Sequence, residues 1–106
     1  MALHHLGPGE ITSLSSGASA GERKTRALVK TDRFEAAQLV LNARDQISGH
    51  SVPGYATLLC LEGAVILKLG KEVRLDAGNW LYLDRGEEHS LIAIEDSSLV
   101  LTILFE

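Results

Sequence analysis

Residues 54–86 decide the fold of this chain, and they read GYATLLCLEGAVILKLGKEVRLDAGNWLYLDRG. Short apolar runs alternate here with Gly54, Gly63, Gly70, Gly78 and Gly86. Turn residues at intervals of about eight positions, with strand-like runs between them, are typical of all-β sandwiches and barrels. Within the stretch, residues 72–75 alternate charged and apolar side chains, as expected for a strand with one solvent-exposed face. The sequence therefore predicts an all-β fold.

The same pattern continues on both sides of this stretch. Residues 34–44 are ambiguous, because they contain good helix formers and could also make a helix. We interpret residues 34–41 as a strand, since their side chains also alternate and every neighbouring segment resembles a strand. The predicted strands are residues 27–30, 34–41, 55–61, 64–69, 72–75, 79–83, 90–94 and 98–105.

Length and composition limit the class of protein. The chain has 106 residues, of which 45% are hydrophobic, and this predicts one globular domain with a single modest core. Lys and Arg number 10 against 14 Asp and Glu, which gives a formal net charge of −4. Nucleic acids and anionic membranes bind basic patches, so neither is expected as a partner. Without a recognisable secretory signal or membrane-spanning run, we expect a cytoplasmic protein.

The first 22 residues differ in composition from the rest. Gly7-Pro8-Gly9 and the Ser-rich stretch 13–21 contain turn formers and few large apolar side chains. We predict an N-terminal arm over residues 1–22 and a barrel domain over residues 23–106. Such an arm either packs on a neighbouring subunit or forms a partly mobile tail, and both alternatives stay open.

Two stretches in the second half resemble the paired motifs of the cupin family. Residues 47–54 with Leu61-Glu62-Gly63 are similar to the first motif, which runs Gly, five residues, His-x-His, three or four residues, Glu, six residues, Gly. Residues 78–89 are similar to the second, which runs Gly, five residues, Pro-x-Gly, two residues, His, three residues, Asn. The resemblance covers about the last three quarters of the chain. It implies a cupin-type double-stranded β-helix, which is a jelly-roll barrel made of two sheets.

The chain departs from these motifs mainly at the metal ligands. The family usually binds its metal through three His and one Glu, and this chain keeps His50 and His89 at two of those positions. Val52 stands at the second His position and Ala56 at the Glu position. Three further departures concern the backbone and turns of the motifs: Asp84 for Pro, Ala93 for Asn, and Arg44 for the opening Gly.

The surviving ligands predict a degenerate metal site. A catalytic metal needs about three protein ligands, and His50 and His89 supply only two imidazoles. Zinc, iron, nickel or manganese is the divalent ion that this pair would take. Cys60, the one cysteine of the chain, is the nearest candidate for a further ligand, since strand parity puts it on the face of Ala56. A cysteine in such a run is more commonly a small buried hydrophobe.

We predict a largely apolar pocket inside the barrel, in which the two imidazoles orient a small molecule. Three hypotheses for the function follow. The first is a cupin-domain protein that binds a small molecule. The second is a metal-dependent oxygenase or isomerase that uses His50 and His89 with a nonstandard third ligand, and the third is a structural or regulatory dimer with a vestigial pocket. The predicted pocket lining is His50, Val52, Ala56, Leu58, Cys60, His89, Leu91 and Ala93.

A homodimer is the expected assembly. Small cupins commonly pair through sheet faces or swapped N-terminal strands, so the resemblance implies it. The last predicted strand adds Leu99, Leu101, Ile103 and Phe105, which a thin isolated barrel would struggle to bury on both faces. We therefore expect exposed apolar side chains on this strand that a second subunit covers.

Overall fold

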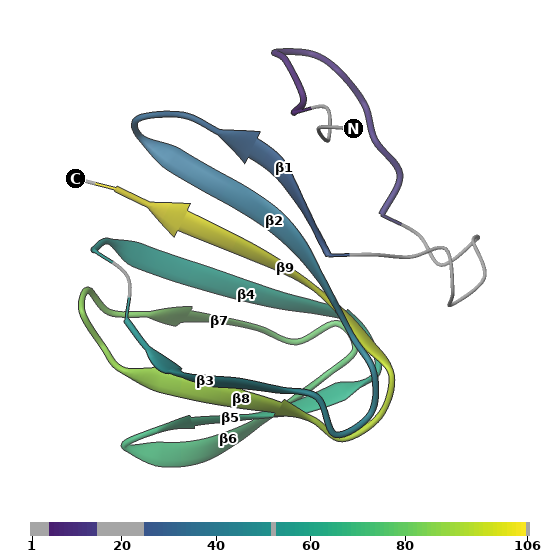
Figure 1. Cartoon of the computed structure of the whole chain (residues 1–106), viewed down its shortest axis with the longest axis vertical. Coiled ribbons are helices and arrows are strands. Elements are labelled where there is room, and N and C mark those ends of the chain that lie inside the picture. Colours follow the sequence, from purple (N-terminus) through teal and green to yellow (C-terminus); the bar gives the residue numbers. More distant parts are fainter. Residues whose placement is uncertain (1–4, 15–24, 52, 106) are drawn as a thin grey trace.

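The computed structural model describes residues 5–14, 25–51 and 53–105, with residues 49 and 50 described by their backbone alone (Figure 1). These residues form nine strands and contain no helix that could span a membrane. The strands are β1 (Arg26–Lys30), β2 (Phe34–Leu41), β3 (Gln46–His50), β4 (Tyr55–Glu62), β5 (Ala64–Leu69), β6 (Lys71–Asp76), β7 (Trp80–Leu83), β8 (His89–Ala93) and β9 (Ser97–Leu104). The predicted all-β class is confirmed.

The strands form two antiparallel sheets. The five-stranded sheet has the order β1-β2-β9-β4-β7, and the four-stranded sheet has the order β3-β8-β5-β6. Most connections pass from one sheet to the other, which makes the arrangement a jelly roll. Figure 1 shows the strands of the two sheets close together at the right and spread apart at the left. The turn between β5 and β6 and the loop between β7 and β8 lie at this wider end, which we call the barrel mouth.

The core lies between the two sheets because each strand directs every second side chain inward. On β4 the inward side chains are Ala56, Leu58 and Cys60, which alternate with partly exposed neighbours. The largest fully buried side chains include Leu67, Leu75, Leu83 and Leu99. Strands from both sheets thus contribute to one apolar cluster.

The apolar side chains of the last strand do not form the expected exposed surplus. Leu99 and Ile103 are buried in the core, and Leu101 and Phe105 pack against it. The prediction of exposure is wrong because β9 lies in the middle of its sheet, between β2 and β4, where the inward face is fully covered.

Each of the eight predicted runs matches a strand, and β3 is the strand that the sequence analysis omitted. Its sequence is QISGH, with a single large aliphatic side chain and an irregular register between Ile47 and His50. Such a segment carries almost no apolar periodicity. It is a strand because β8 pairs with it, so tertiary context decides its structure.

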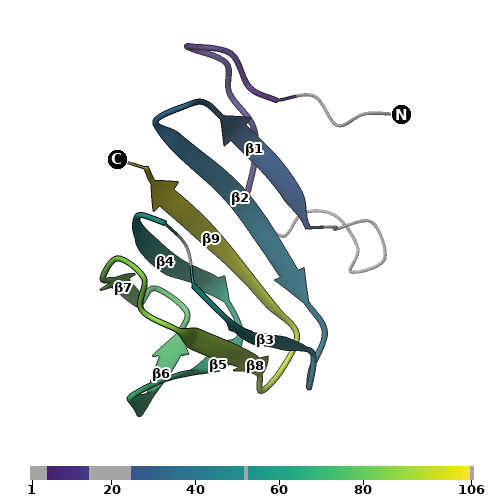
Figure 2. The same cartoon turned by 60° about the vertical axis from the view of Figure 1, so that its left-hand side comes forward.

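The described part of the N-terminal arm lies beside β1. Leu6 N donates to Leu28 O at 2.7 Å, and the Arg26 guanidinium donates to Ser13 O at 2.9 Å. Gln38 Nε2, which is buried, donates both to Leu14 O and to Ser98 Oγ. Figures 1 and 2 both draw this segment close to β1. Residues 5–14 therefore cover part of the edge of their own five-stranded sheet.

Arg44 adopts an unusual backbone conformation in the turn between β2 and β3. Its φ is 76°, in the left-handed region that glycine enters without steric cost. This is the position where the first cupin motif has its opening Gly. Two hydrogen bonds hold this turn, since Arg44 N donates to Ala93 O and Ala43 N donates to Asp96 Oδ1.

Candidate functional site

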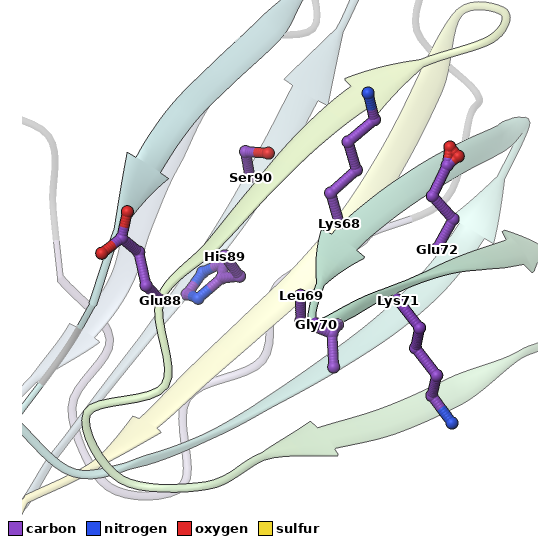
Figure 3. A pocket seen from close by; sticks show the side chains of 8 residues that line it. All are labelled: Lys68, Leu69, Gly70, Lys71, Glu72, Glu88, His89 and Ser90. Atoms are coloured by element: carbon purple, nitrogen blue, oxygen red, sulfur yellow. The ribbon is translucent and has the colours of Figure 1, made fainter.

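Two adjoining cavities open at the barrel mouth, and they share Leu69 and Lys71. The first has a volume of about 480 Å³ and the second a volume of about 370 Å³. Figure 3 shows the side chains around the first cavity. Its lining is Lys68, Leu69, Gly70, Lys71, Glu72, Glu88, His89 and Ser90. The lining of the second is Leu69, Lys71, Val73, Leu81, Tyr82, Leu83, Asp84 and Glu87.

The second cavity lies between the edges of the two sheets. β6 is the edge strand of the four-stranded sheet and β7 is the edge strand of the five-stranded sheet, so the two do not pair with each other. The apolar side chains of this cavity are Leu69, Val73, Leu81 and Leu83, all of which belong to the core or pack against it. The space between the two edges is therefore a cleft with an apolar floor, and we call it the β6–β7 cleft.

The loop between β7 and β8 holds its own carboxylates. Asp84 N donates to Glu87 Oε1 at 3.3 Å, and Arg85 N donates to Asp84 Oδ1 at 2.9 Å. The Arg85 guanidinium lies 5.4 Å from the centre of the Tyr55 ring, a distance suited to a cation–π contact. These interactions fold the loop back on itself and fix one wall of the cleft.

Lys71 is the basic group that both cavities share. It stands opposite Leu69 at the start of β6, on the inward side of the strand, and extends away from Lys68 and Glu72 (Figure 3). Within the described part of the chain, its ammonium group forms no hydrogen bond or ion pair. Lys71 can therefore donate to an acidic or carbonyl group of a molecule in either cavity.

His89 is the buried titratable side chain of the mouth, with 6% of its surface exposed. Its Nδ1 lies 3.1 Å from Glu87 O. A carbonyl oxygen only accepts hydrogen bonds, so Nδ1 carries the proton, and in the neutral ring Nε2 is the acceptor nitrogen. The loop thereby sets the tautomer of an imidazole that lines the first cavity.

The residues predicted to line the pocket separate into three groups, and the first is His89, which lines the first cavity. The backbone of His50 stands directly opposite His89 where β3 pairs with β8, so the fold brings the two motif positions together. The side chain of His50 and all of Val52 lie outside the described residues. The other five, Ala56, Leu58, Cys60, Leu91 and Ala93, belong to the packed core, and none of them lines either mouth cavity.

Cys60 is fully buried, and its Sγ lies 3.3 Å from Glu62 O, to which the thiol donates. Burial raises the pKa of the thiol, with smaller contributions in the same direction from Asp76, Glu95 and Glu62, while a hydrogen bond with the backbone of Glu62 opposes the shift. A thiol held in its protonated form is neither a nucleophile nor a good metal ligand at neutral pH.

The donor groups present do not fit the mononuclear metal of the cupin family. Ala56, at the position of the carboxylate ligand, is fully buried and offers no donor atom. Among the residues that the structure describes, no three His, Cys, Asp or Glu side chains gather closely enough to hold a metal ion. His50 and His89 as metal ligands therefore stay a prediction from the sequence.

Sequence reasoning missed the side chains that line the β6–β7 cleft. Leu69, Val73 and Leu81 were recognised as strand residues, but the inward face of a strand is ordinarily core. Only the topology shows that β6 and β7 are both edge strands, and only the structure shows that side chains of both line one cavity. The sequence contained one signal of the cleft. Lys71 begins β6 and lies on the same face as Val73, and a lysine at that position indicates that the inward face is open to solvent there.

No family model and no curated protein matches this sequence. Among solved structures, the chain is similar to a conserved protein of unknown function from Streptococcus pyogenes, with a TM-score of 0.82 and 19% identity over 100% of this chain and 96% of that one. It is similar to a cupin superfamily protein from Desulfitobacterium hafniense DCB-2, with a TM-score of 0.77 and 15% identity over 92% of this chain and 100% of the other.

A third similar structure is an RmlC-like cupin protein from Desulfovibrio desulfuricans, with a TM-score of 0.69 and 18% identity over 98% of this chain and 96% of that one. Each match covers nearly all of both chains, so the whole arrangement of strands is shared. The sequence identities are too low to assign functional roles to individual residues of this chain. The two sheets, their jelly-roll connections and these structural matches together show that the chain has the cupin fold.

Proposed function

We propose that the protein binds a small, largely apolar molecule at the barrel mouth. The observation that carries this proposal is the pair of adjoining cavities that share Leu69 and Lys71. Their volumes, about 480 and 370 Å³, fall within the range of roughly 300–1,000 Å³ that small-molecule sites occupy. The site therefore has the size of a ligand pocket and stands at the open end of the barrel.

The chemistry of the lining favours a ligand with an apolar body and one polar end. Leu69, Val73, Leu81 and Leu83 would cover the body, at about 25 cal/mol for each Å² of apolar surface removed from water. The ammonium of Lys71 and the ring of His89 would orient the polar end. A few polar groups around an apolar floor is the usual composition of such sites.

A fluorescent probe with these properties tests the site directly. We expect 8-anilinonaphthalene-1-sulfonate, which has an apolar body and an anionic group, to bind the folded protein with one saturable site per chain. Substituting Leu81 by Gln is expected to weaken this binding about tenfold, equivalent to ~1.4 kcal/mol, since it places a polar group on the cleft floor. A fluorescence titration of each protein gives the two dissociation constants.

The matched control is Trp80→Gln, one residue earlier on the same strand. Trp80 projects to the opposite face of β7 and lines neither cavity. Unchanged binding in this variant with weakened binding in Leu81→Gln supports the site. The reverse pattern would place the probe on the outside of the sheet and refute the proposal.

The metal-dependent alternative makes a different prediction. An oxygenase or isomerase that used His50 and His89 would hold a stoichiometric divalent ion, whereas binding at the mouth requires none. We expect elemental analysis of protein purified without a histidine tag to find far less than one zinc, iron, nickel or manganese per chain. A stoichiometric metal that disappears in His89→Ala would overturn this expectation and favour the enzyme.

A further inference from the structure

The β6–β7 cleft contains charges of both signs that do not pair with each other. The ammonium of Lys71 and the carboxylates of Asp84 and Glu87 line the same cavity of about 370 Å³. Within the part of the chain that the structure describes, no ion pair joins this lysine to either carboxylate. Figure 3 shows the side chain of Lys71 extending away from Lys68 and Glu72 as well. The cleft therefore presents a cation and two anions separately to a molecule inside it.

The two carboxylates stand at the ends of one turn in the loop between β7 and β8. Glu87 N donates to Asp84 O at 3.2 Å, which closes the turn, and Gly86 inside it has a φ of 69°. One oxygen of each carboxylate accepts a backbone N–H group, that of Arg85 for Asp84 and that of Asp84 for Glu87. A carboxylate has two oxygens, so the second oxygen of each can accept a hydrogen bond from a ligand. The loop thus holds both anions in place at the wall of the cleft.

A ligand with a single charge fits this cleft poorly. An anion that binds Lys71 would share the cavity with the carboxylates of Asp84 and Glu87, and a cation bound by those carboxylates would share it with the lysine. Like charges brought together lower affinity, so each charged wall of the cleft selects against one kind of singly charged ligand. A molecule that carries an ammonium beside a carboxylate can meet an opposite charge with both groups. The arrangement of charges therefore favours a zwitterion.

The floor and the size of the cleft define the rest of the ligand. The apolar side chains of the floor are Leu69, Val73, Leu81 and Leu83. A volume of about 370 Å³ lies near the lower end of the range for small-molecule sites, roughly 300–1,000 Å³, so the ligand is small. We propose that the cleft binds a free amino acid with an apolar or aromatic side chain, an inference that rests on the proposed function and names its ligand class. The carboxylate of the ligand pairs with the lysine, its ammonium pairs with the carboxylates of the loop, and its side chain lies on the apolar floor.

Three ligands with the same phenyl group test the two charges separately. L-Phenylalanine carries both charges, 3-phenylpropanoate lacks the ammonium, and 2-phenylethylamine lacks the carboxylate. We expect isothermal titration calorimetry of the full-length protein to show the tightest binding for phenylalanine, with each singly charged compound about tenfold weaker. L-Serine keeps both charges and loses the apolar side chain, so it should also bind at least tenfold more weakly than phenylalanine.

Variants that remove one sign of charge assign the two pairings. Lys71→Met should weaken the binding of phenylalanine and 3-phenylpropanoate about tenfold and should not weaken that of 2-phenylethylamine. The double variant Asp84→Asn with Glu87→Gln keeps an oxygen for each backbone N–H group, and it should weaken phenylalanine and 2-phenylethylamine but not 3-phenylpropanoate. The matched control is Lys68→Met, because Lys68 does not line the cleft and extends away from Lys71 (Figure 3). It should bind all three ligands as the wild type does.

The dye titration separates failure of this inference from failure of the proposed function. If the dye binds the wild type and Leu81→Gln weakens it, while phenylalanine binds no more tightly than 3-phenylpropanoate, the cleft is a ligand site but the amino-acid proposal is overturned. If neither the dye nor phenylalanine binds, both proposals fail. Circular dichroism checks that each variant is folded, and the comparison of ligands on the wild type needs no variant. Phenylalanine binding that is unchanged in folded Lys71→Met and in the folded double variant would place the amino acid elsewhere and would also overturn the proposal.

Discussion

Replacing Gly63 by alanine is expected to lower the free energy of unfolding by roughly 3–4 kcal/mol. Gly63 has a φ of 80° in the turn between β4 and β5, a conformation that costs an L-residue about 1–2 kcal/mol. A methyl group there would also collide with the carbonyl oxygen of Asp96 and with Ser97 Oγ, and would lie 2.8 Å from Ser97 Cα. Ser97 is buried, so the collision has little room to relax.

The collision also breaks a link between two turns. Ser97 Oγ accepts a hydrogen bond from Ala64 N at 3.1 Å and lies 2.7 Å from Glu95 O, to which it donates. These bonds join the β4–β5 turn to the segment before β9. Displacing the hydroxyl would leave buried polar groups without partners, which adds to the cost.

Gly78→Ala is the control that isolates the backbone contribution. Gly78 has a φ of 89°, close to that of Gly63, but a methyl group added there would meet nothing within 4 Å. We expect this variant to lose only about 1–2 kcal/mol. Urea unfolding of both variants, followed by circular dichroism, measures the difference. Equal losses in the two variants would show that the packing around Gly63 yields to a methyl group.

Leu99→Ala is the second change with a large expected effect. Leu99 has no exposed surface and lies on β9, where it faces the four-stranded sheet from the middle of its own. Its truncation removes buried methyl groups and leaves a cavity among Leu39, Cys60 and their neighbours in the core. Truncations of this kind lower the free energy of unfolding by roughly 2–5 kcal/mol. We expect a loss in the upper half of this range, because the strands on both sides of β9 limit how far the core can relax into the cavity.

The control for this variant is Ile94→Ala, which shortens an aliphatic side chain that is 41% exposed. We expect a change within about 0.5 kcal/mol, as for most surface substitutions. Both variants should be compared with the wild type at one protein concentration, so that an effect of concentration on stability is the same for all three. A loss below 1 kcal/mol in Leu99→Ala would indicate that the core around β9 collapses to fill the space.

The fold could be predicted because its signals are local. Glycine spacing and alternating side chains mark each long strand, including residues 34–41, whose helix formers are overridden by their place beside β9. Inward positions could also be assigned, since Ala56, Leu58 and Cys60 are buried as strand parity requires.

The mouth could not be predicted, because it depends on which strands become edges. The residues placed in the pocket by parity, such as Leu58 and Leu91, face the interior as expected but are packed into the core. Lys71 and Leu81 line a cleft only because β6 and β7 end their sheets side by side.

The position of β9 has a consequence for the order in which the chain folds during translation. β9 forms hydrogen bonds with β2 on one side and β4 on the other, although the ribosome makes it after both. A nascent chain that stops before residue 97 has the two parts of its larger sheet unjoined, with the edges of β2 and β4 unpaired. Pairing between strands so distant in sequence is slow, so chaperones that shield strand edges would act in this interval.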